Sequence, residues 1–404
     1  MPDLILILGV ILFIGLVVIH EFGHFIIARR NGVEVEEFGI FFPPSIYRHK
    51  TKAGWVFSIN VIPLGGFVKL KGEHDSDTRP GSFGAASLWV KSKIMAAGVI
   101  MNLLTALVLL TILAVVGLPN VIPNQYSVNS DTKVSSQKVF VGTVEAGSPA
   151  AKAGLKSQDI LTAIGQVGQK PVSVSTAANL PNLTKSLAGR KVNIYFTQNG
   201  QSKVVTTTLL GTQTVASSQN NYQAALRSTK LNCASLNLPK GYLGISPVQY
   251  SLQRSTWSAP VTSIGLTTQV TALTFQGLGR VVGGVGSLIA GAVTGNSVAR
   301  ANGQCSATSQ VAGPVGIFMI LKSGSQMGFN FMLFIIAIIS LTLAIMNILP
   351  IPALDGGRLW ITLIAHAIKR PLTAHREETI NATGFIVLIT LVILITIVDV
   401  NRFF

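Results

Sequence analysis

The stretch "VVIHEFGHFIIARR", residues 17–30, places two histidines and a glutamate at the end of an apolar run that begins at Leu4. The run is long enough to cross a bilayer, because a hydrocarbon core of ~30 Å needs roughly 20 apolar residues in a helix. A charged side chain inside such a helix costs about 3 kcal/mol on insertion scales. Three ionisable groups this close together therefore indicate a functional site rather than packing.

The composition of the whole chain is that of a membrane protein. Of its 404 residues 49% are hydrophobic and only 11% are charged, and the mean hydropathy is +0.53. This balance is too apolar for a soluble globular protein. We expect about four transmembrane helices, at residues 4–27, 94–116, 329–349 and 380–398. A weaker stretch, 261–293, is interrupted by glycines and Arg280, and we expect it to form a surface or interfacial helix.

The basic residues predict an orientation in the membrane. The net charge of +16 is spread along the chain, and no nucleic-acid-binding motif accompanies it, so we exclude nucleic acid as a partner. Lysines and arginines are frequent between the first two spans, which places that loop in the cytoplasm. The segment 118–325 then lies outside, and both termini face outward. The N-terminus lacks the basic region and cleavage site of a signal peptide, so we expect it to be retained.

The external segment begins with a recognisable module. Residues 139–166, "VFVGTVEAGSPAAKAGLKSQDILTAIGQ", contain a strand, a Ser-Pro helix start and a second strand, and they resemble a PDZ domain. Strand-like runs at 191–211 and a returning strand at 241–247 would complete a compact β-sandwich. The polar stretch 212–240 between them suits a loop insertion. The module could bind extended peptides at a sheet edge, or act only as a steric filter.

The only two cysteines, Cys233 and Cys305, both fall in this external segment. An oxidising compartment would permit a disulfide between them. Two unpaired thiols remain equally open, because the sequence does not decide the pairing.

The sequence His20-Glu21-Phe22-Gly23-His24 is the motif H-E-x-x-H. On a helix the two histidines at i and i+4 share one face, so both imidazoles can hold one Zn²⁺. Glu21 lies beside that face, where it can deprotonate a water held by the metal. A catalytic zinc usually takes three protein ligands, so the motif requires one more from elsewhere in the chain.

Asp355, in "NILPIPALDGGRLW" at 347–360, is the acidic residue that meets this need. Pro350 and Pro352 break the helix there, and a Gly-Gly pair lets backbone segments approach closely. Irregular backbone at membrane depth is tolerated only where protein buries it or where it lines a watery cavity. We therefore expect Asp355 to be the third zinc ligand.

Taken together, H-E-x-x-H in the first span, L-D-G after a later one and a PDZ-like module between them resemble the site-2 protease family of intramembrane zinc metalloproteases. The bacterial RseP-type branch is the most similar. The resemblance implies that His20, His24 and Asp355 bind zinc and that Glu21 is the catalytic base. These are the four residues that the motifs indicate by themselves.

The resemblance also implies residues that contact substrate. "INVIPLGGFVKLKGE", residues 59–73, is similar to the family's membrane-associated β-hairpin loop, which presents an edge to the substrate through Gly65, Gly66 and Phe67. Asn347 stands where the family has an asparagine near its active site. Asn102 belongs to a motif usually written G-P-x-x-N, of which Gly98 is kept while Val99 replaces the proline. This departure puts in doubt any role of Asn102 that depends on a kinked helix.

The expected fold is thus an α-helical membrane protein with a β-hairpin loop and one PDZ-like domain outside the cytoplasm. We divide the chain into 1–117, with two spans and the β-loop; 118–250, the PDZ-like domain; 251–326, an external or interfacial helical segment; and 327–404, with the last two spans.

The expected function is hydrolysis of peptide bonds in single-span membrane proteins, such as anti-sigma factors or remnant signal peptides, in the inner membrane of a bacterium. A non-enzymatic PDZ adaptor with a structural or vestigial metal site is the alternative. A metal transporter fits less well, because it would need several polar spans. The oligomeric state is left open.

Overall fold

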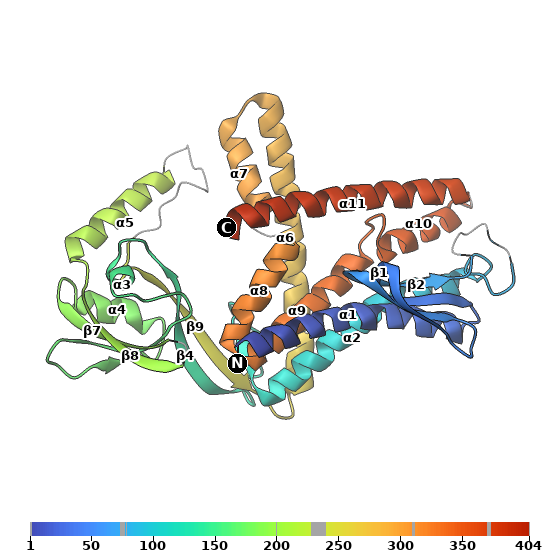
Figure 1. Ribbon diagram of the computed structural model, residues 1–404. Coiled ribbons are helices and arrows are strands. Elements are labelled where there is room, and N and C mark those ends of the chain that lie inside the picture. Colours follow the sequence, from blue (N-terminus) through green and yellow to red (C-terminus); the bar gives the residue numbers. More distant parts are fainter. Residues whose placement is uncertain are drawn as a thin grey trace. The chain divides into compact units, whose positions relative to one another are not determined.

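The computed structural model describes residues 2–72, 77, 79–198, 200–227, 240–308, 312–369 and 373–403. The chain forms two compact units, which are described one at a time. The first contains Met1–Ile112, Ser263–Thr274 and Ala312–Phe404, and the second contains Leu113–Thr262 and Phe275–Val311. Figure 1 shows the elements in chain order.

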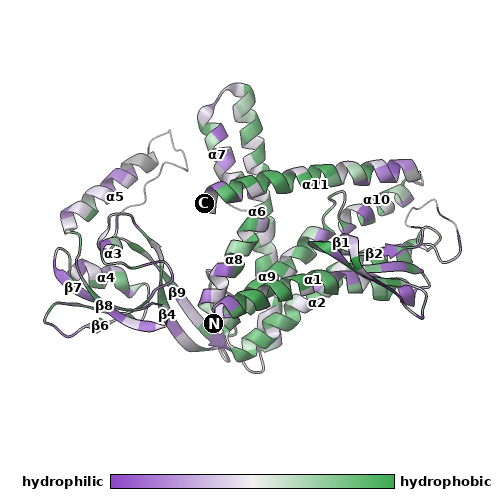
Figure 2. Cartoon of the chain, in the orientation of Figure 1, coloured by the Kyte–Doolittle hydropathy of each residue, from purple (hydrophilic) through white to green (hydrophobic). Residues whose placement is uncertain are grey.

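The first unit is built on long apolar helices, which Figure 2 shows as mostly hydrophobic ribbons. Its elements are α1 (Pro2–Arg30), β1 (Val35–Lys50), β2 (Val56–Leu70), α2 (Leu88–Val116), α8 (Pro314–Met327), α9 (Phe329–Ile348), α10 (Asp355–Ala367) and α11 (Ala374–Phe403). The last four residues of α2 belong to the second unit, and residues 263–274 of α6 (Ala259–Thr294) belong to the first.

Among the described residues, five helices are long and apolar enough to cross a membrane: Pro2–Arg30, Leu88–Val116, Ala259–Thr294, Phe329–Ile348 and His375–Asn401. Four of them coincide with the spans expected from the sequence. The fifth, α6, covers the stretch 261–293, which we expected to be a surface or interfacial helix rather than a span. It is one continuous helix of 36 residues, long and apolar enough to cross a membrane.

The glycines that suggested an interruption are contact residues. In the second unit the end of α6 packs against α7 (Ser297–Thr308). A β-carbon on Gly284 would come within 2.9 Å of the Gly303 carbonyl oxygen, and one on Gly291 would come within 2.6 Å of the Arg300 nitrogen. A glycine inside a helix costs about 1 kcal/mol relative to alanine, and this close backbone packing offsets that cost.

The β-loop between α1 and α2 is more elaborate than the single hairpin expected at 59–73. Strands β1 and β2 pair, and residues 37–40 of β1 are paired both with 66–69 and with 56–59 of β2. The outer part of β1, residues 45–50, pairs with 56–60. Residues 66–68 of β2 therefore lie beside β1 along one edge, and α1 also contacts β2.

The helices of the first unit meet through small residues and one buried carboxylate. Gly23 of α1 faces Ala97 of α2 so closely that a β-carbon would lie 2.8 Å from the Ala97 carbonyl oxygen. Asp399 of α11 is buried and accepts hydrogen bonds from the backbone N–H groups of Gly313 and Gly316, at 2.8 and 2.7 Å. A carboxylate at the N-terminus of α8 satisfies donors that the helix leaves unpaired.

The second unit contains an antiparallel sheet of seven strands in the order β3-β9-β4-β5-β7-β8, with β6 paired to β5. The strands are β3 (Leu118–Asn120), β4 (Lys133–Val144), β5 (Ile160–Gln166), β6 (Val172–Ser173), β7 (Lys191–Gln198), β8 (Gln201–Thr208) and β9 (Ile245–Arg254). The strands expected near 139, 160, 191 and 201 are present. The returning strand expected at 241–247 begins only at Ile245 and runs to Arg254. Two short helices, α3 (Pro149–Lys152) and α4 (Asn179–Ser186), complete the fold.

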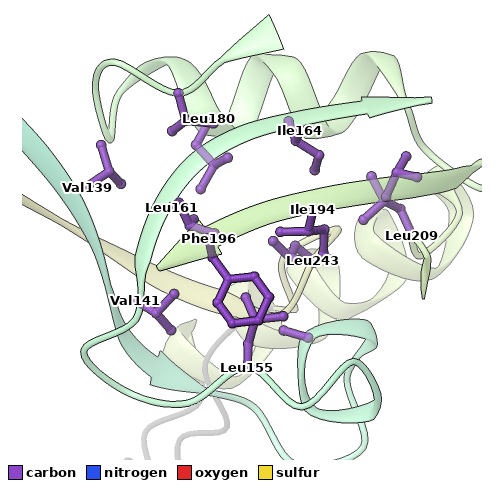
Figure 3. Close-up of a cluster of buried hydrophobic side chains, with 13 residues drawn as sticks. Val139, Val141, Leu155, Leu161, Ile164, Leu180, Ile194, Phe196, Leu209 and Leu243 are labelled. Atoms are coloured by element: carbon purple, nitrogen blue, oxygen red, sulfur yellow. The ribbon is translucent and has the colours of Figure 1, made fainter. Parts of the chain in front are cut away.

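The core of this β-domain lies between the sheet and its short helices (Figure 3). The alternating burial of β7, with Val192, Ile194 and Phe196 inside, shows the period of two of a strand with one buried face. Ser148 begins α3, and its hydroxyl oxygen accepts a hydrogen bond from the Ala151 N–H at 3.2 Å. The Ser-Pro signal in the sequence therefore marks a true helix start.

The polar stretch 212–240 begins with a helix rather than a loop. Helix α5 spans Thr212–Arg227, although its serines, asparagines and threonines are weak helix formers. Val215 is buried, and Tyr222 follows it by seven residues, so both lie on one face of the helix. Cys233 lies outside the described residues, and so does the question of a disulfide between Cys233 and Cys305.

Candidate metal centre

Helix α1 places His20 and His24 one turn apart, as the motif spacing predicts. Both side chains are buried, and their ring centroids are 4.9 Å apart. The two Nε2 atoms lie 3.3 Å from each other. Both imidazoles therefore point to the same place beside the helix.

Asp355 reaches the same place from the other end of the chain. Helix α9 ends at Ile348, and an extended turn through Pro350 and Pro352 leads to Asp355, the first residue of α10. Its Oδ2 atom lies 2.9 Å from His20 Nε2 and 3.1 Å from His24 Nε2. The H-E-x-x-H histidines and Asp355 are more than three hundred residues apart in the sequence, and they thus meet at one place in the structure.

The turn before Asp355 depends on the two glycines that follow it. A β-carbon on Gly356 would overlap the backbone of residues 347–349, and one on Gly357 would overlap Ile351. The indole N–H of Trp360 donates a hydrogen bond to the Ile348 carbonyl at 3.1 Å, which fixes α10 against the end of α9. The Gly-Gly pair is therefore required by close backbone packing.

The three donor atoms fit a metal ion. They all lie within 4.8 Å of one another, and they form the one group of three or more His, Cys, Asp or Glu residues of this kind found in the described part of the chain. Zinc bonds of ~2.0–2.1 Å at tetrahedral angles separate ligand atoms by about 3.3 Å. The observed separations of 2.9, 3.1 and 3.3 Å are close to that value. Two imidazoles and one carboxylate also form a typical donor set for a catalytic zinc.

Backbone and side-chain partners orient the two rings. His24 Nδ1 lies 2.7 Å from the carbonyl oxygen of Ile94, to which it can donate its proton. The Asn102 amide lies 3.2 Å from His20 Nδ1. Such partners hold a histidine in the tautomer that leaves Nε2 for a metal.

Asn102 is buried next to the His20 ring. Only 1% of its surface is exposed, and its backbone carbonyl accepts a hydrogen bond from the Ser340 hydroxyl at 2.8 Å. Its Oδ1 atom is buried without a hydrogen-bond partner. A metal on Nε2 leaves the His20 proton on Nδ1, and turning the amide over lets Oδ1 accept that proton.

Because Gly98 of α2 has no side chain, it leaves open the space next to the donor atoms of His20 and His24. A β-carbon there would lie 2.5 Å from His20 Cε1 and 2.6 Å from His20 Nε2, and it would also overlap His24 Nε2. Any other residue would fill the position between the rings. The glycine of the modified G-x-x-x-N motif therefore has a steric role that does not need the missing proline.

Glu21 faces the β-loop. A β-carbon on Gly66 would lie 3.2 Å from Glu21 Cγ, and the backbone of Val68 is also close to the Glu21 carboxylate. Gly65 and Phe67 belong to the same segment of β2 as Gly66. The Phe67 ring stacks on the Phe42 ring, with centroids 6.2 Å apart. The glutamate thus lies between the metal-ligand cluster and the strand segment that the family resemblance associates with substrate.

Asn347 is half-buried near the C-terminal end of α9, two residues after Ile345 in the last turn of the span.

Sequence reasoning missed two partners of the site. Ile94 acts through its carbonyl group, which leaves no signal in a side-chain pattern. Ser340 is one of the few polar residues in an apolar span, and that was the signal available for it.

Comparison with known proteins agrees with this geometry. The family model described as "Peptidase family M50" matches residues 8–391. A protein of Clostridium perfringens named as a zinc metalloprotease is 27% identical over 396 residues, covering 98% of each chain. One from Campylobacter jejuni with a similar name is 26% identical over 400 residues, covering 96% of this chain and 90% of its own. The protease Eep of Enterococcus faecalis is 25% identical over 455 residues, covering 98% of each chain.

These matches span nearly the whole length of the chain and of its relatives. They agree with the resemblance found from the motifs alone, and they support a multi-pass membrane protein in a lipid bilayer. Zinc is the metal of the family and of the relatives' names. The chain therefore belongs to peptidase family M50, the site-2 type of zinc-dependent membrane metalloprotease.

Proposed function

We propose that this protein cleaves peptide bonds within or near the transmembrane segments of other membrane proteins, with His20, His24 and Asp355 as zinc ligands and Glu21 as general base. The observation that carries this proposal is the convergence of three buried or half-buried donor atoms within 4.8 Å. Two of them come from the first membrane helix and the third from the turn after α9.

Zinc held there by His20, His24 and Asp355 would supply a Lewis acid that activates water and polarises a peptide carbonyl. Glu21 follows His20 directly in α1, so its carboxylate is within reach of a water in the shared space. It accepts a proton from that water at a carboxylate oxygen and later donates it to the nitrogen of the leaving amine. The nearby Val68 backbone would help to orient the Glu21 carboxylate before substrate arrives.

The β-loop provides a place for the substrate backbone. A transmembrane helix satisfies its own backbone groups, so it must unwind before a carbonyl can reach the site. Residues 66–68 of β2 run beside Glu21, and a freed substrate strand could pair with this segment by β-augmentation. Gly65, Gly66 and Phe67 would then contact the substrate, and Asn347 could donate a hydrogen bond to its backbone.

Single-span membrane proteins are the substrate class that this arrangement favours, for example anti-sigma factors or remnant signal peptides. We place the protein in the plasma membrane of a bacterium, with the β-domain of the second unit outside the cytoplasm. The antiparallel sheet of this domain and the short helix that begins after Ser148 support the proposal of a PDZ-like module. It would act as a docking site or as a steric filter for the external part of a substrate.

A non-enzymatic adaptor with a structural metal site fits these observations less well. Structural zinc sites are usually closed by four protein ligands. The group found among the described residues has three, which leaves one position for water or substrate. A glutamate beside this group is also expected of a catalyst rather than of a scaffold.

The decisive experiment compares wild-type protein with Glu21→Gln and Asp355→Ala in detergent, measuring zinc content and cleavage of a model transmembrane substrate. We expect Glu21→Gln to keep zinc and lose activity, and Asp355→Ala to lose both. Glu36→Gln, which removes an exposed carboxylate paired with Lys69, is the matched control and should behave as wild type. Undiminished cleavage by Glu21→Gln would refute the proposed mechanism.

A second measurement tests the substrate and the topology. Proline or glycine inserted in the substrate span should raise cleavage, because it lowers the cost of unwinding the helix. Cysteines introduced in the exposed parts of residues 31–60 should react only with reagents that reach the cytoplasm. Labelling of these positions from outside would reverse the proposed orientation.

A further inference from the structure

A buried aromatic ring near the metal-ligand cluster is flanked by two cations. Phe83 lies between β2 and α2 and is only 1% exposed. The Arg358 guanidinium carbon lies 4.7 Å from the centre of its ring, and the Lys91 ammonium nitrogen lies 5.7 Å from it. Both distances are within the range of attractive cation–π contacts.

Arg358 also faces a carboxylate on another helix. Its Nε atom is 3.5 Å from Oε1 of Glu377 in α11, a residue that is 6% exposed. A buried carboxylate is strongly destabilising when it loses its cation. Arg358 therefore joins α10 to α11 through Glu377, and α10 to the segment before α2 through Phe83.

This cluster is connected to the metal centre on two sides, through Asp355 and through His24. Arg358 lies one helical turn after Asp355, and its backbone N–H donates to the Leu354 carbonyl at 3.2 Å. Phe83 packs in one apolar cluster with Ile94, whose carbonyl oxygen lies 2.7 Å from His24 Nδ1. A displacement of Arg358 would move the start of α10, and a displacement of Phe83 would disturb the support of His24.

We propose that Phe83, Arg358 and Glu377 form a clamp that holds the Asp355 carboxylate against His20 and His24. Its members are positioning residues, since they act on the ligands and contact neither metal nor substrate. The proposal rests on the assignment of His20, His24 and Asp355 as zinc ligands. It predicts that the clamp sets zinc affinity, whereas a purely structural cluster would affect only the stability of the apoprotein.

The test is zinc affinity, measured by competition with chelators on the full-length protein in detergent. We expect Arg358→Gln and Glu377→Gln each to weaken zinc binding about 10-fold or more, the size typical for residues that orient metal ligands. The double variant should be little weaker than either single one, because the first change already breaks the clamp. Glu34→Gln, which removes an exposed partner of Lys71, is the control and should leave affinity unchanged.

Conservative variants separate positioning from folding. Phe83→Trp keeps an aromatic face for Arg358 and should stay within about 3-fold of wild type, whereas Phe83→Leu keeps an apolar side chain and should lose about as much affinity as Arg358→Gln. If Arg358→Gln or Glu377→Gln does not fold, the comparison of Phe83→Trp with Phe83→Leu alone decides whether the clamp sets zinc affinity. Equal zinc affinity for Phe83→Leu and wild type, with only a lower unfolding temperature of the apoprotein, would overturn the clamp.

The ligand assignment has its own control. His20→Ala should abolish zinc binding in the same assay. If His20→Ala binds zinc as well as wild type, the proposed metal centre is wrong, and the clamp proposal fails with it. If His20→Ala loses zinc while the clamp variants keep it, the metal centre stands and the clamp alone is refuted.

Discussion

Gly98 of α2 lies directly against the imidazole ring of His20, so close that a β-carbon would be 2.6 Å from the Nε2 atom. The contact joins the second membrane helix to the first at the point where the donor atoms converge. It means that the space of the proposed metal site is created by a missing side chain as much as by the candidate ligands around it.

The first prediction concerns this space. Gly98→Ala should abolish zinc binding, because the new methyl group would occupy the position between His20 and His24. Metal content after purification measures the effect. Gly15→Ala is the matched control, since a β-carbon at Gly15 of α1 meets nothing within 4 Å, and it should bind zinc normally. Normal zinc content in Gly98→Ala would show that the metal lies elsewhere.

The second prediction concerns the partner of His20. Asn102→Leu should weaken zinc binding roughly 10–100-fold, because His20 Nδ1 loses the group that fixes its tautomer. Asn102→Asp keeps an acceptor for the Nδ1 proton and should retain most of the affinity. Chelator competition on both variants measures the difference. Equal affinities would mean that Asn102 has no role in orienting the ring.

The third prediction concerns the approach of the β-loop to Glu21. A β-carbon on Gly66 would lie 3.1 Å from the Gly39 carbonyl oxygen and 3.2 Å from Glu21 Cγ, so Gly66→Ala must displace the strand or the glutamate. We expect kcat to fall at least several-fold while zinc content stays normal. Loss of zinc together with activity would instead indicate a disturbed fold of α1.

The fourth prediction is a pH dependence in the second unit. The Asp131 carboxylate accepts hydrogen bonds from the hydroxyl and backbone N–H groups of Ser258 and Thr256, which lower its pKa well below the usual value. Because the folded-state pKa is depressed, the stabilisation is fully present above the unfolded-state pKa of about 4. It is lost as the pH falls through the folded-state value.

Thermal unfolding of wild type and Asp131→Ala as a function of pH tests this. We expect the wild-type protein to be the more stable at pH 7 and the difference to shrink steadily below pH 4. Asp77→Ala is a useful control, because its pKa, lowered to about 2, is set by exposed Arg79, and this contact should add little stability. A wild-type advantage that persists unchanged in acid would contradict the assignment.

Much of the site could be predicted from the sequence because its signals are local. The spacing of His20 and His24 fixes a common face once the segment is helical. A turn with two prolines and two glycines is unusual next to an apolar span, which made Asp355 conspicuous. The same local logic identified the strands and the Ser-Pro helix start of the β-domain.

Other features depend on contacts that no local pattern shows. The glycines of α6 argued against a membrane span, because their partners on α7 could not be known. The role of Asn102 was masked by the lost proline, and its position behind His20 emerged only from the packing of α1 against α2. Lys91 and Arg358, which flank Phe83, and Glu377, which faces Arg358, come from three separate helices, and nothing in the sequence joins them.

The sequence by itself determined the membrane-spanning character, the metal-binding residue types and the membership in a protease family, because hydropathy and short motifs follow from neighbouring residues. Only the tertiary structure decided which atoms converge. Asp355 and His20 are 335 positions apart, and their 2.9 Å separation results from helix packing, in which glycines such as Gly23 and Gly357 allow backbones to approach. Such distances depend on the shape of both partners, and shape is a property of the folded chain rather than of any single segment.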